Sequence, residues 1–90
     1  MEEAVLIFKA FSDQRRLEIL QCLSKGERCA CELLKEFNLS QSNLSYHMKI
    51  LIDAKVVVSR PSGKWTVYTL CDQGINNAIH QIERITGRGY

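Results

Sequence analysis

The stretch Leu39-Ser40-Gln41-Ser42-Asn43-Leu44-Ser45-Tyr46-His47-Met48 decides the fold of this 90-residue chain. Leu44, Met48 and the later Leu51 recur at spacings of four and three, which predicts a helix with one buried face. A serine that can cap a helix precedes this pattern, so we expect the helix over Gln41–Ala54. Its first turn and opposite face carry polar side chains suited to an exposed binding surface: Gln41, Ser42, Asn43, Ser45, Tyr46, Lys49 and Asp53.

Another helix is expected just before this one. Apolar residues predict it near Ala30–Phe37, and Asn38-Leu39 is typical of a tight turn. Helix, short turn and helix form the organisation of a helix-turn-helix pair. Further upstream, apolar patterns predict two more helices, at Ala4–Phe11 and Asp13–Leu23.

The periodicity changes after the helix-turn-helix segment. The β-branched run Val56–Val58, the turn cluster Pro61–Lys64 and the alternating segment Trp65–Leu70 predict a β-hairpin. The alternation predicts that one pair of side chains points inward, either Trp65 with Val67 or Tyr68 with Leu70. It does not decide between these two pairs. A last helix is expected from Asp72 to about Thr86. The sequence therefore predicts a single, mainly α domain over residues 1–90 with one β-hairpin.

Composition excludes several classes of protein. The length fits one domain, and 46% hydrophobic residues with a single proline argue against disorder. No stretch resembles an export signal or a membrane span, so we expect the chain in the cytoplasm, where thiols stay reduced. The sequence has no Gly-rich phosphate loop and no Ser/His/Asp spacing, so an enzyme is not expected.

Positive charge is concentrated in one part of the chain. Between Ser40 and Leu70 there are four basic residues and one acidic residue, a net charge of +3. The remaining residues carry eight basic and nine acidic side chains, a net charge of −1. Local positive charge favours phosphate binding, and Gln, Asn, Ser and Tyr are residue types that contact phosphates and base edges. The basic segment therefore predicts a DNA-binding surface.

Four segments have a familiar order along the chain: Phe11–Leu17, Cys29–Leu33, Leu39–Met48 and Gly63–Leu70. In this order they resemble the ArsR/SmtB family of winged-helix metalloregulators, and most closely its arsenite-responsive repressors. The resemblance covers roughly residues 5–82. It implies a winged helix-turn-helix fold, and a homodimer that binds operator DNA and leaves it when a metal or metalloid ion binds.

The resemblance also assigns the expected DNA contacts. It implies that Gln41–Lys49 is the recognition helix and that Ser59–Trp65 is the wing. The family often carries arginine where this chain has Tyr46, which removes one phosphate or guanine contact. No cofactor is expected to be required for DNA binding. The residues expected to contact DNA are Ser40, Gln41, Ser42, Asn43, Ser45, Tyr46, His47, Lys49, Arg60 and Lys64.

Cys29 and Cys31 form a Cys-x-Cys motif, the expected site of the inducing ion. Paired thiolates prefer soft ions, so As(III), Sb(III), Cd(II), Pb(II) and Zn(II) are the candidates. In a regular helix, side chains two positions apart point about 200° away from each other. Both sulfurs then reach one ion only where the backbone is not helical, and this conflict predicts a conformational switch.

The identity of a third ligand stays open. The family's arsenite pattern often adds a cysteine at the position that Leu34 occupies here. An added small thiol or Cys22 can serve, although Cys22 is expected in the core and Cys71 is expected to be structural.

A second ion site of the family, usually for zinc on the last helix, is not expected. Its first half is Asp-x-His, whereas this chain has Asp72-Gln73-Gly74. His80 and Glu83 follow too closely to match the second half, so we expect them on a solvated helix face.

The first and last helices are more apolar than a monomer needs. This excess predicts a dimer interface formed by Val5, Phe8, Ile75, Ile79 and Ile82.

Two other functions remain as alternatives. One is a repressor of the same fold that responds to thiol oxidation. The other is a small thiol redox protein. This alternative requires a strand leading into the cysteine motif, whereas the sequence predicts a helix on each side of the motif.

Overall fold

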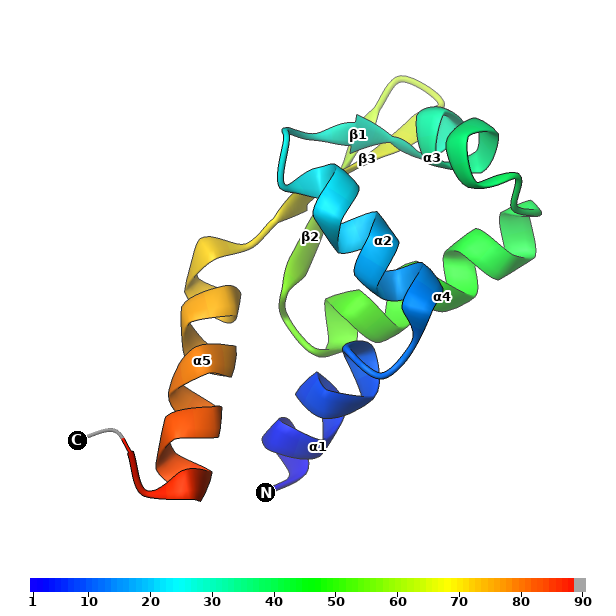
Figure 1. The fold of residues 1–90 in the computed structure, drawn as a ribbon. Coiled ribbons are helices and arrows are strands. Elements are labelled where there is room, and N and C mark those ends of the chain that lie inside the picture. Colours follow the sequence, from blue (N-terminus) through cyan, green and yellow to red (C-terminus); the bar gives the residue numbers. More distant parts are fainter. Residues whose placement is uncertain (89–90) are drawn as a thin grey trace.

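The structure, a computed structural model, describes residues 1–88. These residues form five helices and three strands (Figure 1). In chain order the elements are α1 (Glu2–Ala10), α2 (Gln14–Leu23), β1 (Arg28–Cys29), α3 (Ala30–Phe37), α4 (Gln41–Asp53), β2 (Val57–Ser62), β3 (Trp65–Leu70) and α5 (Asp72–Thr86). The predicted five helices and β-hairpin are confirmed. The two-residue strand β1 was not predicted, so the order becomes α-α-β-α-α-β-β-α.

The predicted helix-turn-helix pair is α3 and α4, and local hydrogen bonds define the turn. Asn38 follows α3 in the left-handed conformation, with φ at 52°. The Ser40 hydroxyl accepts a hydrogen bond from the backbone N–H of Asn43 at 3.1 Å, which caps the start of α4. This turn directs the predicted apolar stripe of α4 into the core, where Leu44, Met48 and Leu51 are buried.

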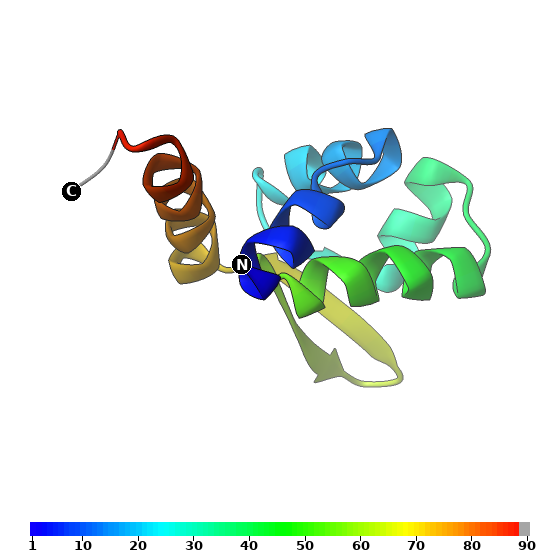
Figure 2. The same cartoon turned by 90° about the horizontal axis from the view of Figure 1, so that it is seen from below.

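The wing belongs to a three-stranded antiparallel sheet in the order β1-β3-β2. Gly63 and Lys64 connect β2 to β3 in a two-residue turn, and Gly63 has φ at 62°, which glycine adopts without strain. Pro61 is tolerated within β2 because β2 is an edge strand. Figure 2 shows the hairpin projecting from the body of the molecule beside α4.

Neither predicted alternation fully describes which residues of β3 point inward. Val67 and Tyr68 are both buried, whereas Trp65 is partly exposed and Leu70 is half-buried. Consecutive strand residues point to opposite faces of a sheet. The central strand β3 is therefore covered on both faces at its middle.

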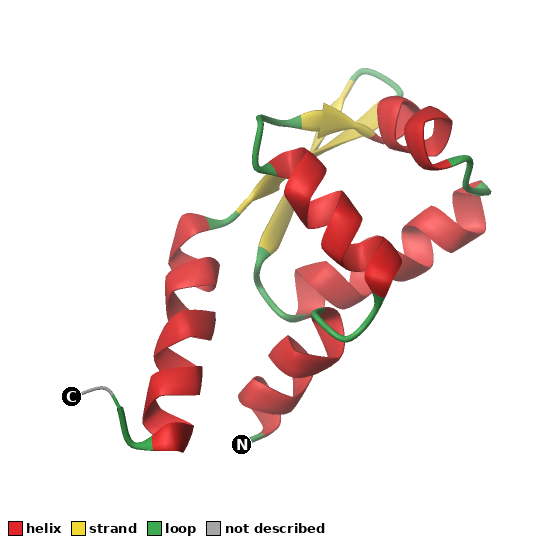
Figure 3. Cartoon of the chain, viewed as in Figure 1, coloured by secondary structure: helices red, strands yellow, loops and turns green. Residues whose placement is uncertain are grey.

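The core lies where α1 to α4 meet the start of β2. Its fully buried large side chains are Ile7, Ile19, Leu33, Met48, Leu51, Val56 and Val57. The strands gather at the side of the molecule away from the two chain ends (Figure 3). Helix α5 lies beside α1, and the chain measures 43 × 21 × 20 Å. Within residues 1–88, no helix is long and apolar enough to span a membrane.

Candidate nucleic-acid interface and thiol pair

The polar face of α4 is open to solvent along its length. The side chains that are exposed on it or at its cap are Ser40, Gln41, Ser42, Asn43, Ser45, Tyr46 and Lys49. Tyr46 is 60% exposed, so its hydroxyl can reach a partner. Lys49 Nζ lies 3.2 Å from Asp53 Oδ2, but such an exposed pair stabilises the helix little and leaves the ammonium available to phosphate.

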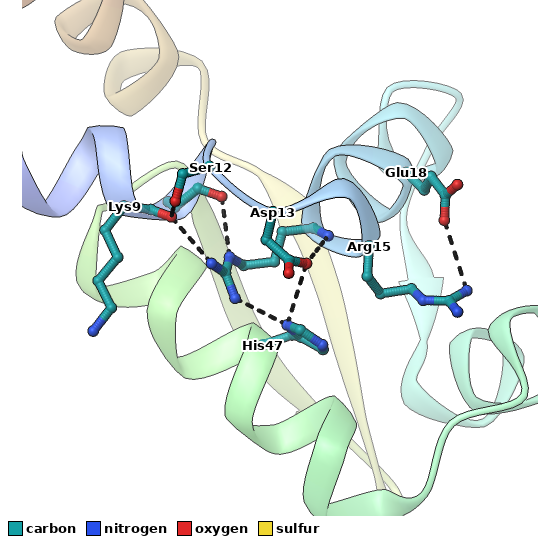
Figure 4. Close-up of polar contacts among 8 residues, drawn as sticks. Lys9, Ser12, Asp13, Arg15, Glu18 and His47 are labelled. Carbon is teal, nitrogen blue, oxygen red and sulfur yellow. Dashed lines mark hydrogen bonds and ion pairs between the residues drawn. The ribbon is translucent and has the colours of Figure 1, made fainter.

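His47 differs from the other residues predicted to contact DNA. Its side chain is turned away from that face toward the ends of α1 and α2 (Figure 4). His47 Nδ1 lies 3.1 Å from Arg16 Nη1 and 4.0 Å from Asp13 Oδ2. The structure therefore brings the polar ring atoms of His47 together with Arg16 of α2 and with Asp13, the cap of α2.

The wing presents both predicted basic residues, Arg60 and Lys64, but Arg60 has a protein partner. Its Nη2 donates to the two carboxylate oxygens of Glu27, at 2.9 and 2.8 Å. Glu27 lies just before β1 and belongs to the part of the sequence counted as the acidic remainder. Folding therefore places a negative charge within the basic surface. The predicted +3 segment overstates the positive charge available to DNA.

We predict that Glu27→Gln strengthens DNA binding. The variant releases Arg60 from its ion pair, so the guanidinium binds a phosphate without first leaving Glu27. Because exposed pairs contribute about 0.2–1 kcal/mol, the expected gain in affinity is about two- to fivefold. One added phosphate contact also steepens the plot of log affinity against log salt concentration by about 0.9. Fluorescence anisotropy at several salt concentrations measures both quantities.

Glu36→Gln is the matched control for this prediction. Glu36 is an exposed acid on α3, and its replacement changes the net charge equally. It is expected to leave the salt slope unchanged. An unchanged slope in Glu27→Gln, or equal gains in both variants, contradicts a specific effect on Arg60.

The two cysteines of the motif straddle the beginning of α3. Cys29 is the N-cap residue in an extended conformation, with φ −70° and ψ 146°, and Cys31 lies inside the helix. Cys29 Sγ accepts a hydrogen bond from the Cys31 N–H at 3.3 Å, and the Cys29 N–H donates to Glu32 Oε1 at 2.8 Å. The conflict expected for two helical cysteines does not arise, because Cys29 lies outside the regular helix.

The Cys29 thiol affects the protonation of Cys31. The hydrogen bond with the Cys29 thiol raises the pKa of Cys31, and partial desolvation raises it further. Over the part of the chain that the structure describes, no group of three or more His, Cys, Asp or Glu side chains could hold a metal ion. Cys22 lies in the core as expected, and Cys71 precedes α5. Within residues 1–88 the two thiols of the motif therefore have no group of further His, Cys, Asp or Glu ligands beside them.

A third exposed surface is formed by α1 and α5. These helices are held together at Glu3, whose Oε1 accepts from Asn77 Nδ2 at 3.2 Å and from Gln81 Nε2 at 2.8 Å. Ile75 packs against the core of its own chain. The other four residues of the predicted dimer interface are exposed apolar side chains: Val5, Phe8, Ile79 and Ile82.

Comparison with known proteins connects these surfaces to a family. Residues 13–59, which include the helix-turn-helix pair, match the family model described as bacterial regulatory protein, arsR family. The chain belongs to the ArsR family. This membership confirms the resemblance and the winged helix-turn-helix fold.

Two arsenical resistance operon repressors are among the relatives of this ArsR-family chain. The protein of Staphylococcus xylosus is 49% identical over 77% of this chain and 66% of its own length. That of Staphylococcus aureus is 43% identical over 93% of this chain and 81% of its own. A solved structure, an ArsR-like transcriptional regulator from Rhodococcus sp. RHA1, has a TM-score of 0.81 at 27% identity, over 96% of this chain and 81% of its own.

The relatives are repressors and not enzymes, which confirms the prediction of a regulatory protein. One argument used against a thiol redox protein was wrong, since β1 does lead directly into the cysteine motif. Two residues form too short a strand to show an alternating pattern in the sequence. Family membership, and not the absence of a strand, therefore decides against that alternative.

Proposed function

We propose that this ArsR-family chain is a cytoplasmic repressor that binds operator DNA as a homodimer and is released when As(III) or Sb(III) binds Cys29 and Cys31. The observation that carries the proposal is the pair of adjacent thiols at the start of α3, the helix directly before the recognition helix α4. Within residues 1–88 all four cysteines are free thiols, as the cytoplasm favours.

The sheet supplies a short connection from the thiols to the wing. Cys29 pairs with Val67 on β3, and Val67 pairs with Arg60 on β2. Neighbouring strands are about 4.8 Å apart, so the backbones of Cys29 and Arg60 are about 10 Å apart. An ion that draws Cys29 and Cys31 together acts on β1, on the start of α3 and, through the sheet, on the wing. The coupling expected between two such sites is about 1–3 kcal/mol.

The chemistry of the thiols favours a metalloid over a divalent cation. Arsenous acid exchanges two hydroxyl groups for two cysteine sulfurs, and the thiol protons leave in two water molecules, so no net proton is released. Divalent cations must instead displace the thiol protons, so their binding is coupled to proton release. Zinc also usually takes four ligands, whereas the chain offers two sulfurs.

The apolar surface of α1 and α5 supports the homodimer. Soluble monomers rarely expose large contiguous apolar patches, and Val5, Phe8, Ile79 and Ile82 are all exposed on these two helices. Pairing two copies through this surface buries it. A two-fold dimer presents two recognition helices to half-sites about one helical turn apart.

The proposal is tested by titrating the protein–DNA complex with individual ions. The DNA is a duplex that the wild-type chain selects from a random-sequence library. As(III) and Sb(III) are expected to release it at lower concentrations than Cd(II), Pb(II) or Zn(II). Raising the pH from about 7 to about 8 is expected to help the divalent ions but not As(III), because only the divalent ions displace protons. Release by zinc alone, or a monomer in sedimentation of the DNA complex, contradicts the proposal.

A further inference from the structure

Arg16 is the one buried charged side chain within residues 1–88, at 6% exposure. It extends from α2 and donates in three directions. Nε donates to the Ala10 carbonyl and Nη2 to the Lys9 carbonyl, both at 3.1 Å, and these carbonyls belong to the last turn of α1. Nη1 faces His47 Nδ1 on α4, also at 3.1 Å. One guanidinium therefore joins the C-terminus of α1 to the recognition helix.

This contact fixes the protonation state of the His47 ring. A guanidinium has no acceptor, so His47 Nδ1 must accept and the ring proton must lie on Nε2. The His47 side chain is 14% exposed, so few water molecules can replace Arg16 as its partner. A protonated ring has no acceptor at Nδ1 and places a second positive charge 3.1 Å from Arg16.

We propose that Arg16 and the neutral ring of His47 are positioning residues that hold α4 in the orientation required for operator DNA. The inference rests on the proposed DNA binding of the chain and adds two residues to it, neither of which needs to contact DNA. Fixing α4 against α1 and α2 reduces the ordering required when the helix enters the major groove.

The charges around His47 determine the expected pH dependence. Burial lowers the pKa of His47, Asp13 raises it, and Arg16 and Arg15 lower it, with a net shift below the ordinary value of 6.5. The Tyr46 ring also lies close to His47, edge-on with a centroid distance of 5.5 Å. The pKa of this ring is higher in the unfolded chain, so the unfolded chain takes up the proton first as the pH falls. The stabilisation of the fold by neutral His47 is therefore complete above about pH 6.5 and declines below it. General attraction to phosphate has the opposite trend, because acid makes a protein more positive.

The experiment measures DNA affinity from about pH 5.5 to about pH 8.0 at constant ionic strength, with the library-selected duplex. Wild-type affinity is expected to become at least about fivefold weaker than at pH 7.5 once the pH has fallen through the pKa of the His47 ring, the lower end of typical coupling between sites. His47→Gln keeps an acceptor that does not titrate. It is expected to bind within about threefold of wild type at pH 7.5 and to lose the acid weakening.

His80→Gln is the matched control. His80 is exposed on α5, 3.9 Å from Glu83, and its replacement is expected to leave the pH profile unchanged.

Arg16→Lys keeps the charge but not the planar donor arrangement, so it is expected to weaken DNA binding at pH 7.5. An NMR titration of the wild-type ring, expected to show a pKa below 6.5 and a proton on Nε2, tests the contact without any variant.

The outcomes separate this inference from the proposed function. A wild-type chain that selects no duplex overturns DNA binding and the inference together. A selected duplex whose affinity does not weaken in acid, or a His47→Gln profile equal to wild type, overturns only the positioning role. A ring that titrates above 6.5 or carries its proton on Nδ1 overturns it as well.

Discussion

Replacing Gly74 by alanine is expected to destabilise the fold by about 2–3 kcal/mol, within the range for overpacked interiors. A Cβ atom at this position lies 1.6 Å from the Lys55 carbonyl oxygen and 2.6 Å from its carbon. Both are backbone atoms, so no side-chain rotation relieves the overlap, and α5 must move away. The loss exceeds the gain of about 1 kcal/mol in helix propensity that alanine otherwise brings.

The backbone at Lys55 has little freedom to yield. Lys55 adopts the left-handed conformation, with φ at 64°, in the turn that ends α4. Its N–H donates to Ile52 at 2.8 Å, and the next N–H, of Val56, donates to Leu51 at 3.2 Å. These two bonds form a Schellman motif that satisfies the last carbonyls of α4. The carbonyl that meets Gly74 is therefore held by the end of the recognition helix.

Thermal unfolding followed by circular dichroism measures this effect. A domain of this size loses about 4–8 °C per kcal/mol, so a fall of about 10–20 °C in Tm is expected. Asn76→Ala, at an exposed position two residues along α5, is the control and is expected to change stability by less than about 0.5 kcal/mol. A Gly74→Ala chain that melts with or above the wild type contradicts the close packing of the two backbones.

The same packing bears on the second ion site of the family, which we do not expect in this chain. Gly74 occupies the position of the first histidine of that site. Any side chain at this position overlaps the backbone of Lys55. A histidine introduced at position 74 is therefore accommodated only if α5 moves away from the end of α4.

Sequence patterns were sufficient for the elements that repeat a signal along several turns or residues. The stripe of Leu44, Met48 and Leu51 and the cap at Ser40 predicted α4 because each is a local property of the chain. The strand β1 has two residues, and two residues carry no periodicity. It exists because Arg28 and Cys29 pair with β3, which lies almost forty positions later in the sequence.

The candidate site was predicted less completely, because its remaining contacts join distant parts of the chain. Glu27 and Arg60 are 33 positions apart, and Arg16 and His47 are 31 apart. Nothing in a local pattern distinguishes these charged residues from solvated ones.

Replacing both Cys29 and Cys31 by serine is expected to abolish release by arsenite and to leave DNA affinity within about threefold of wild type. Serine at position 29 is a favourable N-cap and can complete a capping box with Glu32, so α3 is expected to begin at the same residue. Hydroxyl groups bind soft ions poorly, so the ion loses both ligands while the fold keeps its cap. The concentration of arsenite that releases half of the DNA measures the response.

Cys71→Ser is the matched control, since it removes one thiol outside the motif and is expected to leave the arsenite response unchanged. If the double serine variant is still released by arsenite, the ion binds elsewhere and the assignment of Cys29 and Cys31 is wrong.

Mild peroxide provides the second comparison. Should peroxide, but not arsenite, release the wild-type chain and fail to release the double serine variant, Cys29 and Cys31 respond to oxidation instead. Both signals require Cys29 and Cys31, but only arsenite adds an atom that bridges the two sulfurs. Mass spectrometry of the protein released by arsenite therefore distinguishes them. A bound arsenic atom supports the metalloid sensor, whereas added oxygen or the loss of two hydrogens contradicts it.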